Sequence, residues 1–149
     1  MLNIIAFVPV LILIAVIDIK KRIIPNEIIY PAALAALVFS LFNGIGLWAA
    51  VVSSLACIGM CMVMVFGVGG GLGFGDVKLA GLIGMIIPFP LSILALLASY
   101  LIAIIYVCIQ DKGEVAKKGI PFAPFMAGSA IFFLLAGATL VSWYANAYL

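Results

Sequence analysis

Charged side chains are scarce in this sequence. Its 149 residues include 7 Lys and Arg and 5 Asp and Glu, so 8% of the chain is charged, against roughly a quarter in soluble domains. The scarcity comes with 68% hydrophobic residues and a mean hydropathy of +1.47. This composition excludes a soluble domain and predicts an integral membrane protein.

Histidine is absent from the chain. Ser-His and Cys-His catalysis and the H-E-x-x-H zinc hydrolases are therefore excluded. Ser-Lys catalysis stays open in principle, but Lys78 and the lysines of the connectors have no serine near them in the sequence.

Cysteine is rare, and Cys57, Cys61 and Cys108 all fall inside apolar runs. An odd count without histidine argues against a disulfide framework or a usual zinc site. We interpret these thiols as small apolar packing groups. We expect no metal, no cofactor and no nucleic-acid partner.

What the chain does contain is long apolar runs separated by short polar connectors. Strands of a membrane barrel would instead alternate apolar and polar residues. We predict an all-α, polytopic transmembrane protein in which residues 1–149 form a single domain. About six spans are expected, at 2–18, 27–43, 47–66, 77–88, 90–109 and 121–145.

The ends of two of these segments raise questions of their own. The N-terminal run has no basic residue before it and no A-x-A site, so we expect a retained span rather than a cleaved signal peptide. The fourth segment would reach only about 18 Å as a helix, against a hydrocarbon core of roughly 30 Å. It starts within the membrane boundary, thins the bilayer, or extends past Pro88 and Pro90.

With six spans, the odd-numbered connectors share one side of the membrane, and all twelve charged residues then lie on that side. The rule that positive residues face inward makes it the cytoplasm, with both termini outside. We therefore expect a multi-pass protein of the cell membrane. The charges are Asp18, Lys20, Lys21, Arg22 and Glu27 around the first connector, Asp76 and Lys78 at the third, and Asp111, Lys112, Glu114, Lys117 and Lys118 in the fifth.

The first and third connectors have distinct local signals. Pro25 pushes Ile24 out of helical geometry, and Asn26 is expected to cap the second helix. The third connector contains the glycine-rich stretch 67–75, which suits a hinge, close helix packing or approach by another backbone. It lacks the G-x-x-x-x-G-K-[ST] pattern of a nucleotide-binding loop.

Asp18 closes the first span and Asp76 opens the fourth, both at the cytoplasmic edge. Carboxylates beside hydrocarbon are costly and mark functional candidates. Each has an alternative: Asp18 reaches water beside Lys21 or Arg22, and Asp76 caps the fourth helix. Together they suggest a dyad that shares a proton and cleaves a peptide bond by acid–base catalysis.

The helix dipoles suggest which carboxyl group holds the shared proton. Asp76 lies at a helix N-terminus, where an anion is favoured, and Asp18 lies near a helix C-terminus, where it is disfavoured. We hypothesise that Asp18 is protonated and Asp76 is the ionised base, although the basic residues after Asp18 oppose this.

Three stretches together resemble the prepilin peptidases, membrane aspartic proteases of the GxGD class. They are IDIKKRIIPNEI (17–28), GLGFGDVKLAGLIG (71–84) and IPFAPFMAGSAI (120–131). The second matches a G-x-G-D-x-K motif, and the third is similar to a late Pro-Phe-x-Pro-Phe segment in which many members have Gly where Ala123 stands. The presenilin group also uses GxGD, but its Tyr-Asp and Pro-Ala-Leu motifs are missing here.

The resemblance implies that Asp18 and Asp76 are the catalytic pair of a prepilin peptidase, which removes the basic leader of type IV prepilin-like proteins at the cytoplasmic membrane face. Gly73 and Gly75 either provide the active-site backbone geometry or serve plain packing. Lys78 either steadies the ionised site or faces lipid phosphates.

The larger, bifunctional members carry an insertion before the first aspartate and also methylate the new N-terminus. This chain lacks room for it, so we expect peptidase activity only, as in the compact tight-adherence (Flp-type) pilus enzymes. The rival hypothesis is a small membrane transporter or a pilus or secretion assembly subunit, because acids at a glycine-broken helix also suit ion pathways.

Overall fold

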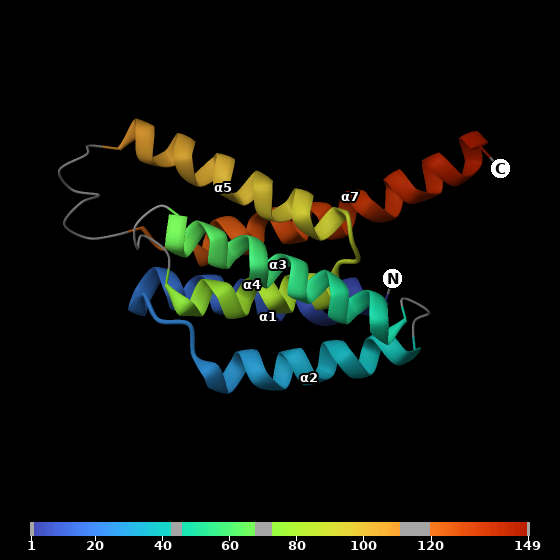
Figure 1. Cartoon of the computed structure of the whole chain (residues 1–149), viewed down its shortest axis with the longest axis horizontal. Helices are drawn as coiled ribbons and strands as arrows, with labels where there is room; N and C mark the ends of the chain where they lie inside the picture. The colour runs from blue at the N-terminus through green and yellow to red at the C-terminus, as the bar shows by residue number, and fades with distance from the viewer. Residues whose placement is uncertain (1, 43–45, 68–72, 111–119, 149) are drawn as a thin grey trace.

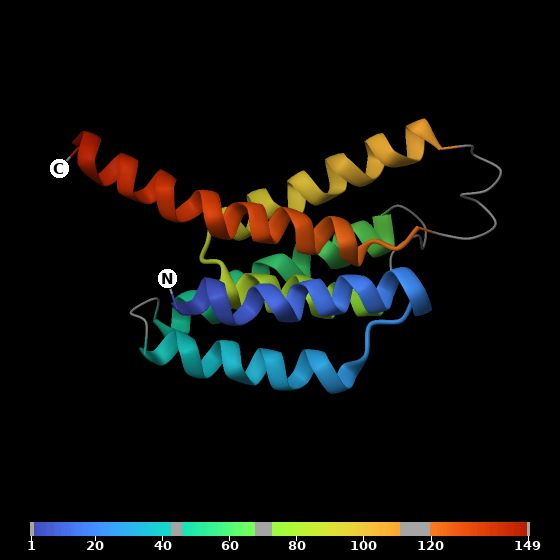
Figure 2. The same cartoon turned by 180° about the vertical axis from the view of Figure 1, so that it is seen from behind.

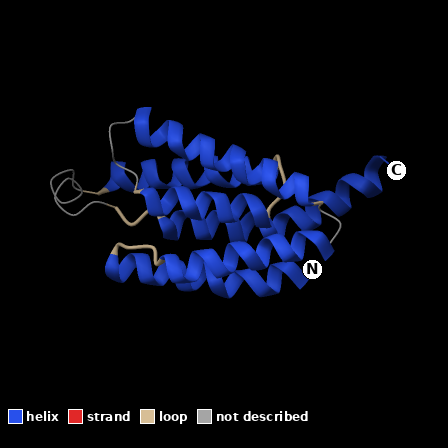
Figure 3. Ribbon diagram, turned by 60° about the horizontal axis from the view of Figure 1, so that its bottom comes forward, coloured by secondary structure: helices blue, strands red, loops and turns tan. Residues whose placement is uncertain are grey.

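The structure is a computed structural model that describes residues 2–42, 46–67, 73–110 and 120–148. Over these residues the chain is all-helical and contains no strand, which confirms the all-α part of the predicted fold (Figure 3). The helices are α1 (Leu2–Lys21), α2 (Asn26–Phe42), α3 (Leu47–Gly67), α4 (Phe74–Ile86), α5 (Leu91–Ile109) and α7 (Ala123–Tyr148).

The helices run back and forth along one direction, as Figure 1 and its reverse view in Figure 2 show. By length and composition α3 and α5 suit a bilayer crossing, and α2 and residues 123–137 are shorter apolar helices. Large side chains on α5 such as Leu101, Ile104 and Ile105 remain exposed. A bilayer accounts for such a surface, whereas water does not. The number of six spans stays a prediction.

The described charged residues gather at one end of the bundle. This end holds the last turn of α1 and the first turns of α2 and α4. Both termini of the chain lie at the opposite end (Figure 1). The five charges predicted for the fifth connector, between 111 and 118, lie outside the described residues. Which compartment each end faces stays a prediction.

Helix α4 is the most enclosed element of the bundle. It packs against α2, α3, α5 and α7, and nine of its thirteen residues are buried. Its length is about 20 Å at the usual rise per residue. Because protein rather than lipid surrounds it, this helix does not need to match the thickness of the bilayer by itself.

The bounds of α4 correct the predicted segment 77–88. The helix starts at Phe74 and ends at Ile86, so the alternative in which it extends past Pro88 and Pro90 is wrong. The N–H of Ile87 donates the last helical hydrogen bond, to the Ile83 carbonyl at 2.8 Å. Pro88 has no N–H with which to continue. The chain then turns, and α5 begins at Leu91.

Helices α3 and α4 meet backbone to backbone at Gly84. A Cβ atom at Gly84 would lie 2.6 Å from the carbonyl oxygen of Ser53 and 2.7 Å from the Cα of Ser54. The Ser53 hydroxyl donates to the Ile87 carbonyl at 3.1 Å and shares a 2.8 Å hydrogen bond with the hydroxyl of Ser92. The crossing therefore depends on a glycine at 84 and is reinforced by a buried polar link to the start of α5.

This crossing generates a stability prediction. Replacing Gly84 by Ala should lower the free energy of unfolding by about 1–3 kcal/mol, because α3 must move away from α4. Gly59→Ala in α3 is the matched control, since a Cβ there meets no atom within 4 Å. Helix propensity alone predicts that this control is neutral or up to about 1 kcal/mol more stable. Unfolding of the purified variants in mixed micelles is the measurement, and equal stability of the two variants would contradict the crossing.

Candidate active site

Asp18 is a buried carboxylate in the last turn of α1. Its exposed fraction is 6%, so the alternative in which it extends into water is not what the structure shows. Its Oδ2 accepts a hydrogen bond of 3.1 Å from the N–H of Ala123, at the start of α7. A contact between the first and last helices thus fixes the position of this side chain.

Asp76 lies in the first turn of α4 and is 9% exposed. The Gly73 N–H donates to its Oδ2 at 3.1 Å, and its own N–H donates to the Gly73 carbonyl at 3.0 Å. The capping role considered for Asp76 is therefore confirmed. Capping is not the only role open to the Asp76 side chain, because it also lines a cavity.

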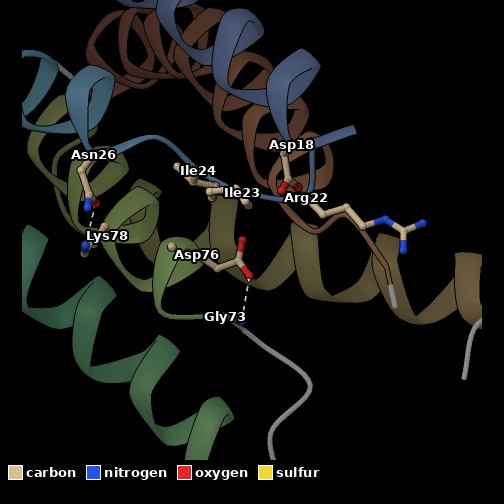
Figure 4. A pocket seen from close by; sticks show the side chains of 9 residues that line it. Asp18, Arg22, Ile23, Ile24, Asn26, Gly73, Asp76 and Lys78 are labelled. Carbon is tan, nitrogen blue, oxygen red and sulfur yellow. Dashed lines mark hydrogen bonds between the residues drawn. The ribbon is translucent and has the colours of Figure 1, made fainter. Parts of the chain in front are cut away.

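One cavity brings the two carboxylates together (Figure 4). It has a volume of about 300 Å³ and opens at the charged end of the bundle. All five residues that the sequence singled out for the site line it. The complete lining is Asp18, Arg22, Ile23, Ile24, Asn26, Gly73, Gly75, Asp76 and Lys78. The dyad predicted from separate motifs thus has a shared space that is large enough for water and part of a peptide.

The pKa of the Asp76 carboxyl group is strongly perturbed. This group lies in the first turn of α4, at the charged end of the bundle where the cavity opens. Burial raises its pKa from 3.8 to about 6, the Gly73 hydrogen bond opposes this rise, and the Asp18 charge adds to it. The last effect means that the charge of Asp18 acts on the Asp76 carboxyl group, as in a dyad.

Residues 5–108 match the type IV leader peptidase family. The chain belongs to this family. It is 31% identical over 146 residues to a prepilin leader peptidase/N-methyltransferase of Bacillus subtilis, a match that covers 94% of this chain and 58% of that protein. Proteins with the same description from Aeromonas salmonicida and Aeromonas hydrophila are 28% identical over 149 residues, covering 94% of this chain and 51% of theirs. The chain thus spans a little over half the length of these relatives. No solved structure matches it.

The structure changes the argument about which carboxyl group of this leader peptidase homologue holds a proton. From the sequence, the only helix end expected near Asp18 is the C-terminus of α1, where an anion is disfavoured. In the fold, Asp18 also accepts from an amide at the N-terminus of α7, where an anion is favoured. Helix dipoles therefore no longer distinguish the two aspartates, and the assignment of the proton to Asp18 stays a prediction.

The two motif glycines differ in their surroundings. Gly73 has φ −81°, which any residue adopts, and a Cβ there would make an ordinary contact of 3.7 Å with Asp76. At Gly75 a Cβ would lie 3.1 Å from the Cβ of Ile24. Gly75 thus lets the first connector pack closely on α4. The remaining glycine-rich residues, 68–72, lie outside the described residues.

Lys78 connects α4 to the first connector, a link that sequence reasoning missed. Its Nζ donates to the Asn26 Oδ1 at 2.7 Å and lies 5.4 Å from the centre of the Tyr30 ring. Asn26 is already the first residue of α2, and the Pro25 carbonyl before it accepts the first helical hydrogen bonds, from the N–H groups of Ile28 and Ile29. The expected cap by Asn26 is therefore wrong, and the Asn26 side chain binds Lys78 instead. Both residues belong to the quoted motifs, but no local pattern in the sequence indicates that they meet.

The Pro-Phe-x-Pro-Phe segment packs rather than faces the cavity. Phe122 is buried and stacks on Tyr100 with ring centres 5.1 Å apart, and Phe125 lies 5.3 Å from Tyr106. Both contacts fix the start of α7 against α5, and so the amide that binds Asp18. Within the described part of the chain no three His, Cys, Asp or Glu side chains gather to hold a metal ion, and the expectation of no metal and no cofactor stays a prediction.

The electrostatics generate a titration prediction. Asp76 should titrate near pH 6, and Asp18→Asn should lower the pKa of Asp76, because the Asp18 charge is one of its two raising causes. Burial remains in the variant, so the pKa should stay above 3.8. The measurement is ¹³C NMR of labelled aspartate carboxyl groups in micelles. An Asp76 pKa that is identical in both proteins would show that the carboxyl groups do not interact.

Proposed function

We propose that this chain is an aspartic endopeptidase that removes the basic leader from type IV prepilin-like proteins at the cytoplasmic face of the cell membrane. The observation that carries the proposal is the shared cavity, in which buried carboxylates from α1 and α4 meet at the charged end of the bundle. Membership of the type IV leader peptidase family supports the substrate class.

The chemistry follows from two carboxyl groups that share one proton. One carboxyl group, in its ionised form, takes a proton from water as the water oxygen attacks the scissile carbonyl carbon. The other, in its protonated form, donates a hydrogen bond and then its proton to the carbonyl oxygen. Collapse of the tetrahedral intermediate returns that proton to the group that donated it, the proton taken from water passes to the leaving amine, and the peptide bond breaks.

The cavity's position suits a substrate that is itself anchored in the membrane. We propose six spans with both termini outside, so that the charged end faces the cytoplasm. A substrate helix then remains in the bilayer while its leader reaches the two carboxylates from the water side. Residues 1–149 act as one domain in this proposal, with the bilayer and the prepilin as partners.

Removal of either carboxylate should abolish cleavage. We expect Asp18→Asn and Asp76→Asn each to lower the cleavage rate of a co-expressed prepilin by at least about 10²-fold, because acid–base catalysis by a positioned group is worth this much. Glu27→Gln is the matched control, since Glu27 lies in the first turn of α2 and does not line the cavity. Precursor and mature bands are compared at equal enzyme levels.

The outcomes separate the proposal from its rival. If both aspartate variants cleave like the control, the aspartic mechanism fails. If the wild-type chain leaves a panel of candidate prepilins uncut, peptidase activity fails and a transporter or assembly subunit becomes the better hypothesis.

The matched relatives are described as both peptidase and N-methyltransferase. We propose that this chain carries the peptidase activity alone. The cavity that Asp18 and Asp76 line supports the hydrolytic activity. Mass spectrometry of the processed prepilin, in a host without another methylating enzyme, should show a free N-terminal amine. An added mass of one methyl group that depends on this chain would refute the proposal.

A further inference from the structure

The connector between α1 and α2, residues 22–25, is fastened at both ends. Arg22 ends α1 in a left-handed conformation, with φ 53°, and its N–H donates to the Asp18 carbonyl at 2.8 Å. At the other end the Lys78 Nζ holds the side chain of Asn26. The connector's position is therefore fixed relative to both helices that carry the carboxylates.

The middle of this connector has unused backbone groups. Ile23 and Ile24 are not helical, and the proline after Ile24 favours extended geometry there. The Ile24 side chain is buried against Gly75, whereas that of Ile23 is 67% exposed. Among the residues that the structure describes, no hydrogen bond engages the backbone N–H or C=O of either isoleucine. A non-helical segment that is held at both ends, has unpaired backbone groups and is favoured in extended geometry before Pro25 has the properties of a sheet edge.

This segment lies on the wall of the cavity. Ile23 and Ile24 line it together with Asp18 and Asp76, and Figure 4 shows the two isoleucines next to each other, to one side of the two aspartate side chains. A peptide bond placed for attack by water must lie close to both carboxylates. Its neighbouring residues therefore pass directly alongside the connector.

We propose that the substrate residues flanking the scissile bond bind in extended form, pairing their backbone with Ile23 and Ile24 as an added strand. The inference rests on the proposed peptidase function and adds the mode of substrate recognition. Strand addition satisfies the polar backbone of an unwound segment at the membrane boundary, where water is limited. It also tolerates different side chains, because the hydrogen bonds come from the main chain.

The first test changes the backbone of the substrate. Synthetic peptides copied from a prepilin are made with one amide at a time replaced by an ester, on both sides of the scissile bond but not at it. One flanking position should lose about tenfold in kcat/KM, since its N–H donates to the connector, and the adjacent positions should lose less than about threefold, since neighbouring residues of a strand point their N–H groups to opposite sides. An ester near the far end of the leader is the control.

The second test locates the pairing on the enzyme. Ile23→Cys is introduced into the full chain with Asp76→Asn, which prevents cleavage, and Cys108→Ser, which removes an exposed thiol. Disulfide formation with a peptide carrying cysteine beside the sensitive amide should be at least about tenfold faster than for Phe74→Cys. Phe74 is the matched control because it is 65% exposed, lies at the same end and does not line the cavity.

The outcomes are distinguishable. If the wild-type chain cleaves no prepilin peptide, the proposed function fails and this inference fails with it. If it cleaves every ester peptide with the same kcat/KM, the peptidase stands and the backbone pairing is wrong. If one ester is sensitive but Phe74→Cys reacts as fast as Ile23→Cys, the substrate pairs elsewhere and the role of the connector is refuted.

Discussion

The backbone contact between α3 and α4 is the constraint on which the rest of the molecule depends. Gly84 lets α4 approach the Ser53–Ser54 backbone, and Gly81 packs against Ile58 one turn earlier. A helix this close to its neighbour is enclosed by protein, which is why thirteen residues suffice for it. Because α4 also carries Asp76 in its first turn, the same contact determines where the Asp76 carboxyl group lies within the bundle.

The second carboxylate is placed by a different long-range contact. Phe122 and Phe125 pack on tyrosines of α5 and fix where α7 begins. The first amide of α7 then meets Asp18. The late Pro-Phe motif therefore acts on the site through a backbone N–H rather than through its rings. This gives a physical reason for an aromatic motif far from either aspartate in the sequence.

Sequence reasoning was most successful where local physics decides the outcome. Apolar runs located all six described helices to within a few residues. Because charged residues are scarce and costly beside hydrocarbon, Asp18 and Asp76 could be identified as candidate site residues. It failed where tertiary contacts decide. Nothing in the local sequence shows that Ala123 donates to Asp18 or that Asn26 binds Lys78 instead of capping its own helix. The end of α4 was missed because Ile87 and Pro88 continue the apolar run after the helix has stopped.

The hydrogen bonds to the two carboxylates explain how buried acids remain able to change protonation state. Asp18 and Asp76 each accept from a neutral backbone amide at a helix start. Such a donor stabilises the anion with less than the full charge of an ion pair. At Asp18 the positive charge of Arg22, which lines the same cavity, acts in addition. Lys78 is nearby but donates to the Asn26 amide oxygen. Its charge therefore helps to hold Asn26, and with it the end of the connector, in place.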